Sequence, residues 1–146
     1  MTEELVTLET AKLLKKKGFN ERTLFAYKNN GDLYQDPNRI ESSYNSLPVP
    51  ELCENFHTCA NFIPCNKCQI AIHLISAPNQ SFAQKWLRET KNLHIEISYM
   101  YENYWIYDIL TIPNHDLVGL SDIPIIHYKS YEEALEAGIQ ETLKLI

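Results

Sequence analysis

The clearest hydrophobic pattern lies near the middle of the chain, in residues 77–89. Apolar side chains recur there at helical spacing, at Phe82, Ala83, Trp86 and Leu87. Polar side chains occupy the opposite side of the same stretch. The pattern predicts a helix that packs one apolar stripe against a core and keeps a charged outer face.

The sequence leaves two features of this helix open: the residue that caps its start and the role of its outer face. Pro78 suits a first helical turn, because no N–H is needed there and its φ is already helical. Either Asn79 or Ser76 can supply the capping oxygen. Lys85 and Arg88 on the outer face are either solvated or assist an anionic ligand near the positive helix N-terminus.

Two further helices are expected, one towards each end of the chain. Thr7 can cap the first, and Gly18 supplies the left-handed residue that ends it. Ser130 and Glu133 form a capping box at the start of the last helix. Gly138 in the interior of that helix costs about 1 kcal/mol relative to alanine, so we expect the helix to approach a sheet closely there.

Apolar alternation and turn residues predict a first set of strands. Residues 23–28 and 33–35 flank Asn30-Gly31, a dipeptide typical of type I′ turns, and therefore form a β-hairpin. Residues 69–76 are rich in isoleucine and leucine and lead into the central helix as a buried strand.

A second hairpin follows the central helix. Residues 94–99 alternate between apolar and polar side chains, and residues 104–111 return after a turn at 102–103. Residues 113–124 are expected to be a loop, and residues 125–128 a short edge strand. The order of elements predicts an α+β fold, an antiparallel sheet of about four to five strands packed by three helices.

Length and charge restrict the class of protein. The 146 residues suffice for one domain, residues 1–146, with a sizeable core. The net charge of −6 argues against binding to nucleic acid, which needs clustered Lys and Arg. No apolar stretch approaches the roughly 20 residues of a membrane span, and the acidic N-terminus does not resemble a signal peptide. We therefore expect an intracellular protein without a membrane partner, and a homo-oligomer stays open.

One histidine and four cysteines crowd into an irregular, proline-containing segment at about residues 36–68. They are Cys53, His57, Cys59, Cys65 and Cys68. The spacing of Cys65 and Cys68 is that of a zinc knuckle, in which two thiolates of one turn bind one metal. Strong zinc motifs contain two such pairs, and this chain has one, so free thiols are the alternative. Zinc, held by Cys53, Cys59, Cys65 and Cys68, is the one cofactor that the sequence suggests.

Sequence signatures of enzymes are missing. There is no nucleophile elbow, Walker loop, dinucleotide fingerprint or zinc-protease motif. The chain has four glycines, which do not cluster into a phosphate-binding loop, and its five histidines are scattered. We therefore do not expect an enzyme.

Aromatic residues are concentrated in the predicted second hairpin, at Tyr99, Tyr101, Tyr104, Trp105 and Tyr107. Strand alternation places Tyr99 and Tyr101 on one face. Such side chains suit contact surfaces, since they offer large area at low entropy cost, but they also favour strands without any binding role. The candidate ligand-binding residues are Gln80, Lys85, Arg88, Tyr99 and Trp105.

Several blocks of the sequence carry a family resemblance. They are residues 5–13, 17–19, 77–81, 84–89, 131–138 and 143–146. Together they resemble a family of small uncharacterised proteins of phages and prophages of gut Bacteroides and their relatives. Position 79 departs from the family pattern, where threonine is expected instead of Asn79. The cysteine-bearing segment falls outside these blocks.

The resemblance implies a phage source, the cytoplasm of a bacterial host, and no catalytic residue. We expect an accessory protein that acts by binding, by occupying a host protein or sequestering a small signalling molecule to counter host defence. One alternative is a zinc-stabilised protein-interaction module built on residues 53–68. A second is a small enzyme that acts on phosphoesters or nucleotides.

Overall fold

The computed structural model describes residues 4–28, 30–36, 38–46, 74–120 and 127–146. The chain divides into two compact units. The first unit comprises Met1–Leu13 and Asn79–Ile146, and the second comprises Leu14–Pro78. In the described residues three α-helices accompany antiparallel strands, so the predicted α+β class is confirmed.

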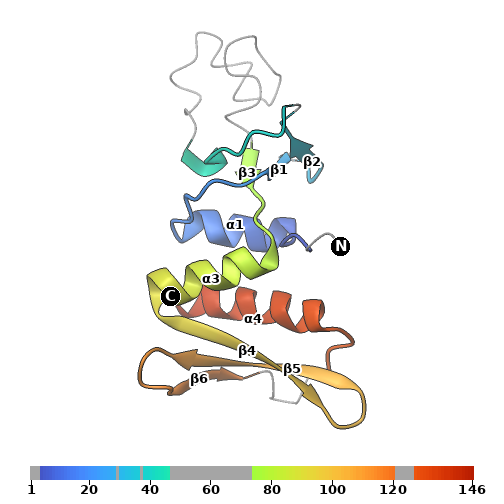
Figure 1. The fold of residues 1–146 in the computed structure, drawn as a ribbon, viewed down its shortest axis with the longest axis vertical. Helices are drawn as coiled ribbons and strands as arrows, with labels where there is room; N and C mark the ends of the chain where they lie inside the picture. Colours follow the sequence, from blue (N-terminus) through green and yellow to red (C-terminus); the bar gives the residue numbers. More distant parts are fainter. Residues whose placement is uncertain (1–3, 29, 37, 47–73, 121–126) are drawn as a thin grey trace. The chain divides into compact units, whose positions relative to one another are not determined.

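The first unit contains a three-stranded antiparallel sheet with the order β4-β5-β6 (Figure 1). Its strands are β4 (Leu93–Met100), β5 (Tyr104–Thr111) and β6 (Leu117–Leu120). β4 and β5 form the predicted second hairpin. The turn between them contains Glu102 and Asn103, whose φ angles of 79° and 69° lie in the left-handed region.

β6 is an element that the sequence pattern does not predict, because residues 113–124 read as a loop. The strand is short and includes Gly119, a residue that is depleted in strands. The structure gives this glycine a packing reason: a Cβ at Gly119 would lie 2.6 Å from Cδ1 of Ile109. The glycine therefore allows β6 to pair closely with β5.

Two helices, α3 (Gln80–Lys91) and α4 (Tyr131–Leu145), cover one face of this sheet (Figure 1). α4 packs on β4 and β5, and α3 packs on β4 and α4. The predicted apolar stripe of α3 is confirmed at Ala83, Trp86 and Leu87, which are buried. The sheet contributes Ile95, Tyr107 and Ile109 to this core, and α4 contributes Ala134, Leu135, Ile139 and Leu143.

The N-terminal cap of α3 is Asn79, one of the two residues that the sequence left open. Its Oδ1 accepts a hydrogen bond from the Phe82 N–H at 2.8 Å. Pro78 lies before the cap and outside the helix. The prediction that it occupies the first helical turn is therefore wrong. At the other end, Asn92 takes a left-handed conformation, and its N–H donates to the carbonyl of Leu87.

The cap of α4 differs in one bond from the predicted capping box. Ser130 Oγ accepts from the Glu133 N–H at 3.1 Å, as expected. The Glu133 carboxylate accepts from the Lys129 N–H at 3.1 Å, one residue before the cap. Both bonds satisfy donors at the helix start, so the stabilising effect of the motif is kept.

Gly138 lies where α4 crosses the sheet. A Cβ there would approach Cγ2 of Ile95 to 2.8 Å and Cγ of Tyr107 to 3.2 Å. Helix propensity alone predicts that Gly138→Ala stabilises the protein by about 1 kcal/mol. Because the neighbouring groups are a β-branched methyl and a ring in a packed core, we expect a net loss of about 1 kcal/mol, measured by urea unfolding. A gain in stability would contradict this close helix–sheet contact.

The second unit has its own three-stranded sheet, with the order β2-β1-β3. β1 (Phe25–Lys28) and β2 (Leu33–Gln35) form the predicted first hairpin. β3 (Leu74–Ser76) pairs with the other edge of β1. The prediction of a single sheet of about four to five strands is therefore wrong.

Two local sets of hydrogen bonds stabilise the irregular parts of the second unit. The last turn of α1 (Leu8–Lys16) belongs to this unit. Gly18, whose φ is 96°, follows it, and the Phe19 N–H donates to the carbonyl of Leu14 at 2.9 Å. Asn45, in a short 3₁₀ helix, donates to the carbonyl of Phe19 at 2.9 Å and accepts from the Ser76 N–H at 3.0 Å. One side chain thus links three segments of this unit.

Candidate functional site

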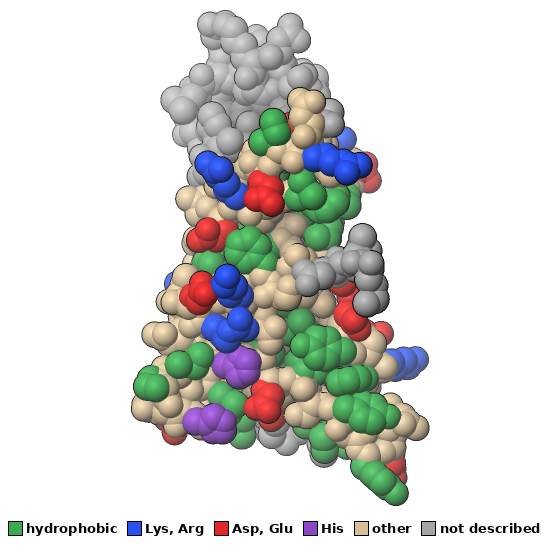
Figure 2. Space-filling model, in the orientation of Figure 1, with side chains coloured by type: hydrophobic (Ala, Val, Ile, Leu, Met, Phe, Trp, Pro, Cys, Tyr) green, Lys and Arg blue, Asp and Glu red, His purple; other side chains and the backbone are tan. Residues whose placement is uncertain are grey.

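Four aromatic side chains form an aromatic surface at the end of the β4–β5 hairpin: Tyr99, Tyr101, Trp105 and Tyr131. Tyr101 is 91% exposed, Tyr99 57% and Tyr131 40%. The Tyr99 and Trp105 ring centroids are 4.9 Å apart, and those of Trp105 and Tyr131 are 5.6 Å apart. Figure 2 shows hydrophobic side chains gathered over this end of the hairpin.

Hydrogen bonds and ring contacts hold Tyr99 and Trp105 within the aromatic surface, whereas Tyr101 is almost fully exposed. Tyr99 and Trp105 are direct partners in the β4–β5 register, and the Tyr99 hydroxyl donates to Oδ1 of Asn103. The Trp105 N–H donates to the carbonyl of Tyr128 at 2.9 Å, and its carbonyl accepts from the Tyr128 N–H at 3.1 Å. A partner that binds Tyr99 and Trp105 therefore has less side-chain entropy to remove there than at Tyr101.

The remaining aromatics of the hairpin belong to other environments. The ring of Tyr104 stacks on His127 with centroids 3.7 Å apart. Tyr107 is buried and packs on Tyr128 at 6.1 Å. Burial raises the pKa of Tyr107 to about 12, with smaller contributions from Tyr128 and Glu141. Tyr107 therefore stays protonated at physiological pH and acts as a core residue.

Gln80, a predicted ligand-binding residue, is used inside the fold. Its side chain is buried, and Nε2 donates to the carbonyl of Glu132 at 3.0 Å and to Oε1 of Glu136 at 2.9 Å. Its backbone N–H donates to the carbonyl of Glu4 at 2.9 Å. These bonds give Gln80 a structural role, which is a correction to the ligand-binding prediction for this residue.

The carboxylate of Glu136 is the centre of a polar network in the first unit. Oε2 accepts from the backbone N–H and the hydroxyl of Thr7, each at 3.1 Å, and from the hydroxyl of Thr10. Gln140 Nε2 donates to Thr10 Oγ1 at 2.9 Å. The carboxylate thus occupies the start of α1, where the helix dipole favours negative charge. No local sequence pattern predicts this network, because its members are far apart along the chain.

Lys85 and Arg88 lie on α3 away from the buried stripe. Lys85 Nζ is 4.0 Å from Oε1 of Glu89, one turn further along. Such exposed pairs contribute only about 0.3–0.5 kcal/mol. Neither basic residue lines the pocket described next. The assignment of Lys85 and Arg88 to an anionic ligand therefore stays a prediction, beside the interpretation of a solvated helix face.

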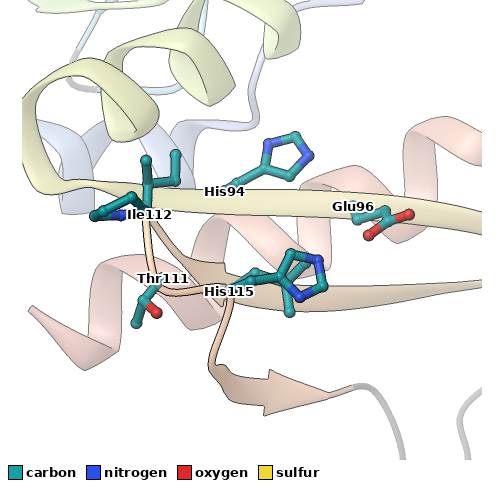
Figure 3. A pocket seen from close by; sticks show the side chains of 7 residues that line it. His94, Glu96, Thr111, Ile112 and His115 are labelled. Atoms are coloured by element: carbon teal, nitrogen blue, oxygen red, sulfur yellow. The ribbon is translucent and has the colours of Figure 1, made fainter.

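A pocket of about 390 Å³ lies at the end of the sheet where β5 turns towards β6 (Figure 3). Its lining residues are His94, Glu96, Leu110, Thr111, Ile112, Pro113 and His115. His94 and Glu96 are two positions apart on β4 and so share a face, opposite to that of Ile95. The pocket therefore lies on the face of β4 that points away from α4.

Backbone hydrogen bonds brace the loop that forms one side of the pocket. The Thr111 N–H donates to the carbonyl of Asp116, and the His115 N–H donates to the carbonyl of Thr111, each at 2.9 Å. Oγ1 of Thr111 accepts from the Asp116 N–H at 2.9 Å. The Ile112 N–H donates to the carbonyl of Asn92 at the same distance. The pocket wall is therefore preformed.

The polar groups of the pocket include an unpaired one. Nδ1 of His94 is buried and has no hydrogen-bond partner among the described residues. Glu96 is directly opposite Asp108 in the β4–β5 register, so two carboxylates meet on this face. The spacing of His94 and Glu96 in the strand could have indicated a shared face. The approach of His115 from the following loop had no signal in the sequence.

The predicted zinc ligands Cys53, Cys59, Cys65 and Cys68 lie outside the described residues, and the zinc site stays a prediction. Within the described ranges, no group of three or more His, Cys, Asp or Glu side chains is arranged to hold a metal ion. The same part of the chain contains no helix that is both long and apolar enough to cross a membrane.

Comparisons with known proteins give no relative: no family model, no curated protein and no solved structure matches the chain. The two candidate sites therefore rest on their own geometry. One is the aromatic surface, and the other is the pocket at His94 and Glu96.

Proposed function

We propose that this chain is a phage-encoded accessory protein that binds a host protein through its aromatic surface. The observation that carries the proposal is the exposure of Tyr101 and Tyr99 beside Trp105 and Tyr131. Tyrosine and tryptophan are the residue types enriched at protein interfaces and at their energetic centres. Strand stability does not explain Tyr101, because β4 ends at Met100 and Tyr101 lies in the hairpin turn.

The charges near the aromatic surface indicate the chemistry of the partner. Glu102 in the hairpin turn and Glu132 and Glu133 after Tyr131 are exposed, and Lys129 is the basic residue close to them in the sequence. The rim is therefore mainly acidic, in keeping with the net charge of −6. A partner that offers an apolar recess bordered by Lys and Arg would complement both features.

The phage source and the host partner rest on the family resemblance. Interference with host defence by occupying a host protein is the role that the resemblance suggests. The corresponding place of action is the cytoplasm of the bacterial host. The aromatic surface supports this binding role, because it provides an exposed aromatic contact area.

The test is affinity capture from host lysate with three versions of the protein. We expect the wild type to retain one host protein, and the double variant Tyr99→Ala/Tyr101→Ala to lose at least about tenfold in affinity, or about 1.4 kcal/mol. Leu117→Ala is the matched control, because Leu117 is also an exposed apolar residue, 56% accessible, but lies on β6. It should bind as the wild type does.

Two outcomes would contradict the proposal. One is capture of the same proteins by the wild type and by the double variant. The other is a stable dimer that the double variant abolishes, seen by light scattering, because the aromatic surface would then be a contact between two copies of this chain.

A further inference from the structure

We propose that the pocket at His94 and Glu96 binds the guanine base of a small nucleotide. This inference goes beyond the proposed function, since it concerns the other end of the β4–β5 hairpin and shares no residue with the aromatic surface. It rests on three properties of the pocket: its size and walls, its hydrogen-bonding groups, and the charge on the same face of the unit.

The size and walls of the pocket suit a planar heterocycle. Its volume of about 390 Å³ falls within the range of about 300–1,000 Å³ typical of small-molecule sites. Leu110, Ile112 and Pro113 supply apolar surface, and the ring of His115 can stack on a base. The loop between β5 and β6 is already held by backbone bonds, so the binding free energy is not spent on ordering it.

The polar groups select the base. An ionised Glu96 only accepts hydrogen bonds, and its two oxygens suit two adjacent N–H donors. Guanine offers N1–H and the 2-amino group side by side, whereas adenine and cytosine place a ring acceptor next to their amino group. Guanine also presents O6 and N7 as acceptors, which complement imidazole N–H donors and the Thr111 hydroxyl.

The buried nitrogen of His94 provides an independent reason for a polar ligand here. Most buried polar atoms in native proteins have a hydrogen-bond partner, and Nδ1 of His94 has none among the described residues. A guanine acceptor would satisfy Nδ1 of His94 once the imidazole turns this buried nitrogen towards the pocket. A lone metal ion would be the other answer to an unpaired imidazole, but the described side chains are not arranged to hold one.

The surroundings of the pocket favour a nucleotide over a nucleoside. Figure 2 shows Lys and Arg side chains over α3 on the same face of the first unit as histidine side chains over the sheet. The basic residues of α3 are Lys85, Arg88 and Lys91. A phosphate that leaves the open side of the pocket would meet positive charge on this face, while the base meets Glu96.

Isothermal titration calorimetry with four probes tests the inference: GMP, IMP, AMP and ribose 5-phosphate. We expect GMP to bind with a Kd below about 100 μM, and IMP, which lacks the 2-amino group, to bind about tenfold more weakly. AMP and ribose 5-phosphate should bind more weakly still. Glu96→Gln should weaken GMP binding by at least about tenfold, because the amide replaces one acceptor by a donor.

The control variant is Glu102→Gln, which makes the same change of charge in the hairpin turn, outside the pocket. It should leave GMP binding unchanged. Glu96→Gln should fold normally, because it removes one of two facing carboxylates, and its thermal unfolding checks this. The inference is overturned if GMP does not bind up to about 1 mM, if AMP or ribose 5-phosphate binds as tightly as GMP, or if Glu96→Gln has no effect. None of these outcomes bears on capture by the aromatic surface.

Discussion

Replacing Glu136 with alanine is expected to lower the free energy of unfolding by about 3 kcal/mol. The carboxylate accepts from Thr7, Thr10 and Gln80, so the substitution leaves several donors without an acceptor. Thr10 and Gln80 are buried, and water cannot freely replace the lost bonds. The start of α1 also loses a negative group that complements its dipole.

Urea unfolding followed by circular dichroism measures this effect. Glu89→Ala is the matched control, because Glu89 is an exposed helical glutamate whose one described contact is a weak pair with Lys85. Its change should stay within about 0.5 kcal/mol. A loss of that small size for Glu136→Ala would mean that the network does not hold α1 to α4.

The second large effect is expected for Asn45→Ala in the second unit, about 2 kcal/mol of local stability. The side chain donates to the carbonyl of Phe19 and accepts from the N–H of Ser76. Phe19 and Ser76 are both buried, so alanine leaves a carbonyl and an amide of the backbone without partners. β3 should then open more often, because it is a three-residue strand held at this point.

Hydrogen exchange of the Ser76 amide reports that opening directly. A loss of about 2 kcal/mol corresponds to exchange about thirtyfold faster. Asn38→Ala is the control, since Asn38 is an exposed asparagine in a turn and should leave the Ser76 amide protected. Equal exchange rates in Asn45→Ala and the wild type would show that Asn45 does not secure this unit.

Local signals in the sequence predicted local structure well. Turn residues at 30–31 and 102–103 identified both hairpins, and the capping residues near Asn79 and Ser130 marked two helix starts. Each of these features depends on side chains within a few positions of one another. Gly138 also predicted the close helix–sheet approach, because a glycine inside a helix needs a compensating reason.

Features that depend on long-range pairing could not be predicted. The sequence did not show that β3 joins β1 in a separate sheet, because strand partners distant in sequence leave no local pattern. It missed β6, whose four residues include a glycine. The bond between Thr7 and Glu136 joins residues 129 positions apart, and a Glu on a helix face reads as solvated.

The candidate sites also differ in whether they depend on local or on long-range contacts. Tyr99 and Trp105 were predicted as binding residues from the aromatic enrichment of one hairpin. The structure places them side by side, and their binding role stays a prediction. Gln80 was assigned to a ligand but bonds to α4, since its position at a helix start did not reveal its partner. The pocket is formed by a strand face and a loop. Strand alternation indicates which residues share the face, but no sequence pattern indicates that the loop approaches it.

We propose that the aromatic surface contacts a host protein. Photo-crosslinking in the bacterial host tests this contact, with benzoylphenylalanine introduced in place of Tyr101 or, as a control, in place of Leu117. We expect one dominant covalent adduct with a host protein from position 101 and none from position 117. Identical adducts from both positions, or no adduct from position 101, would contradict it.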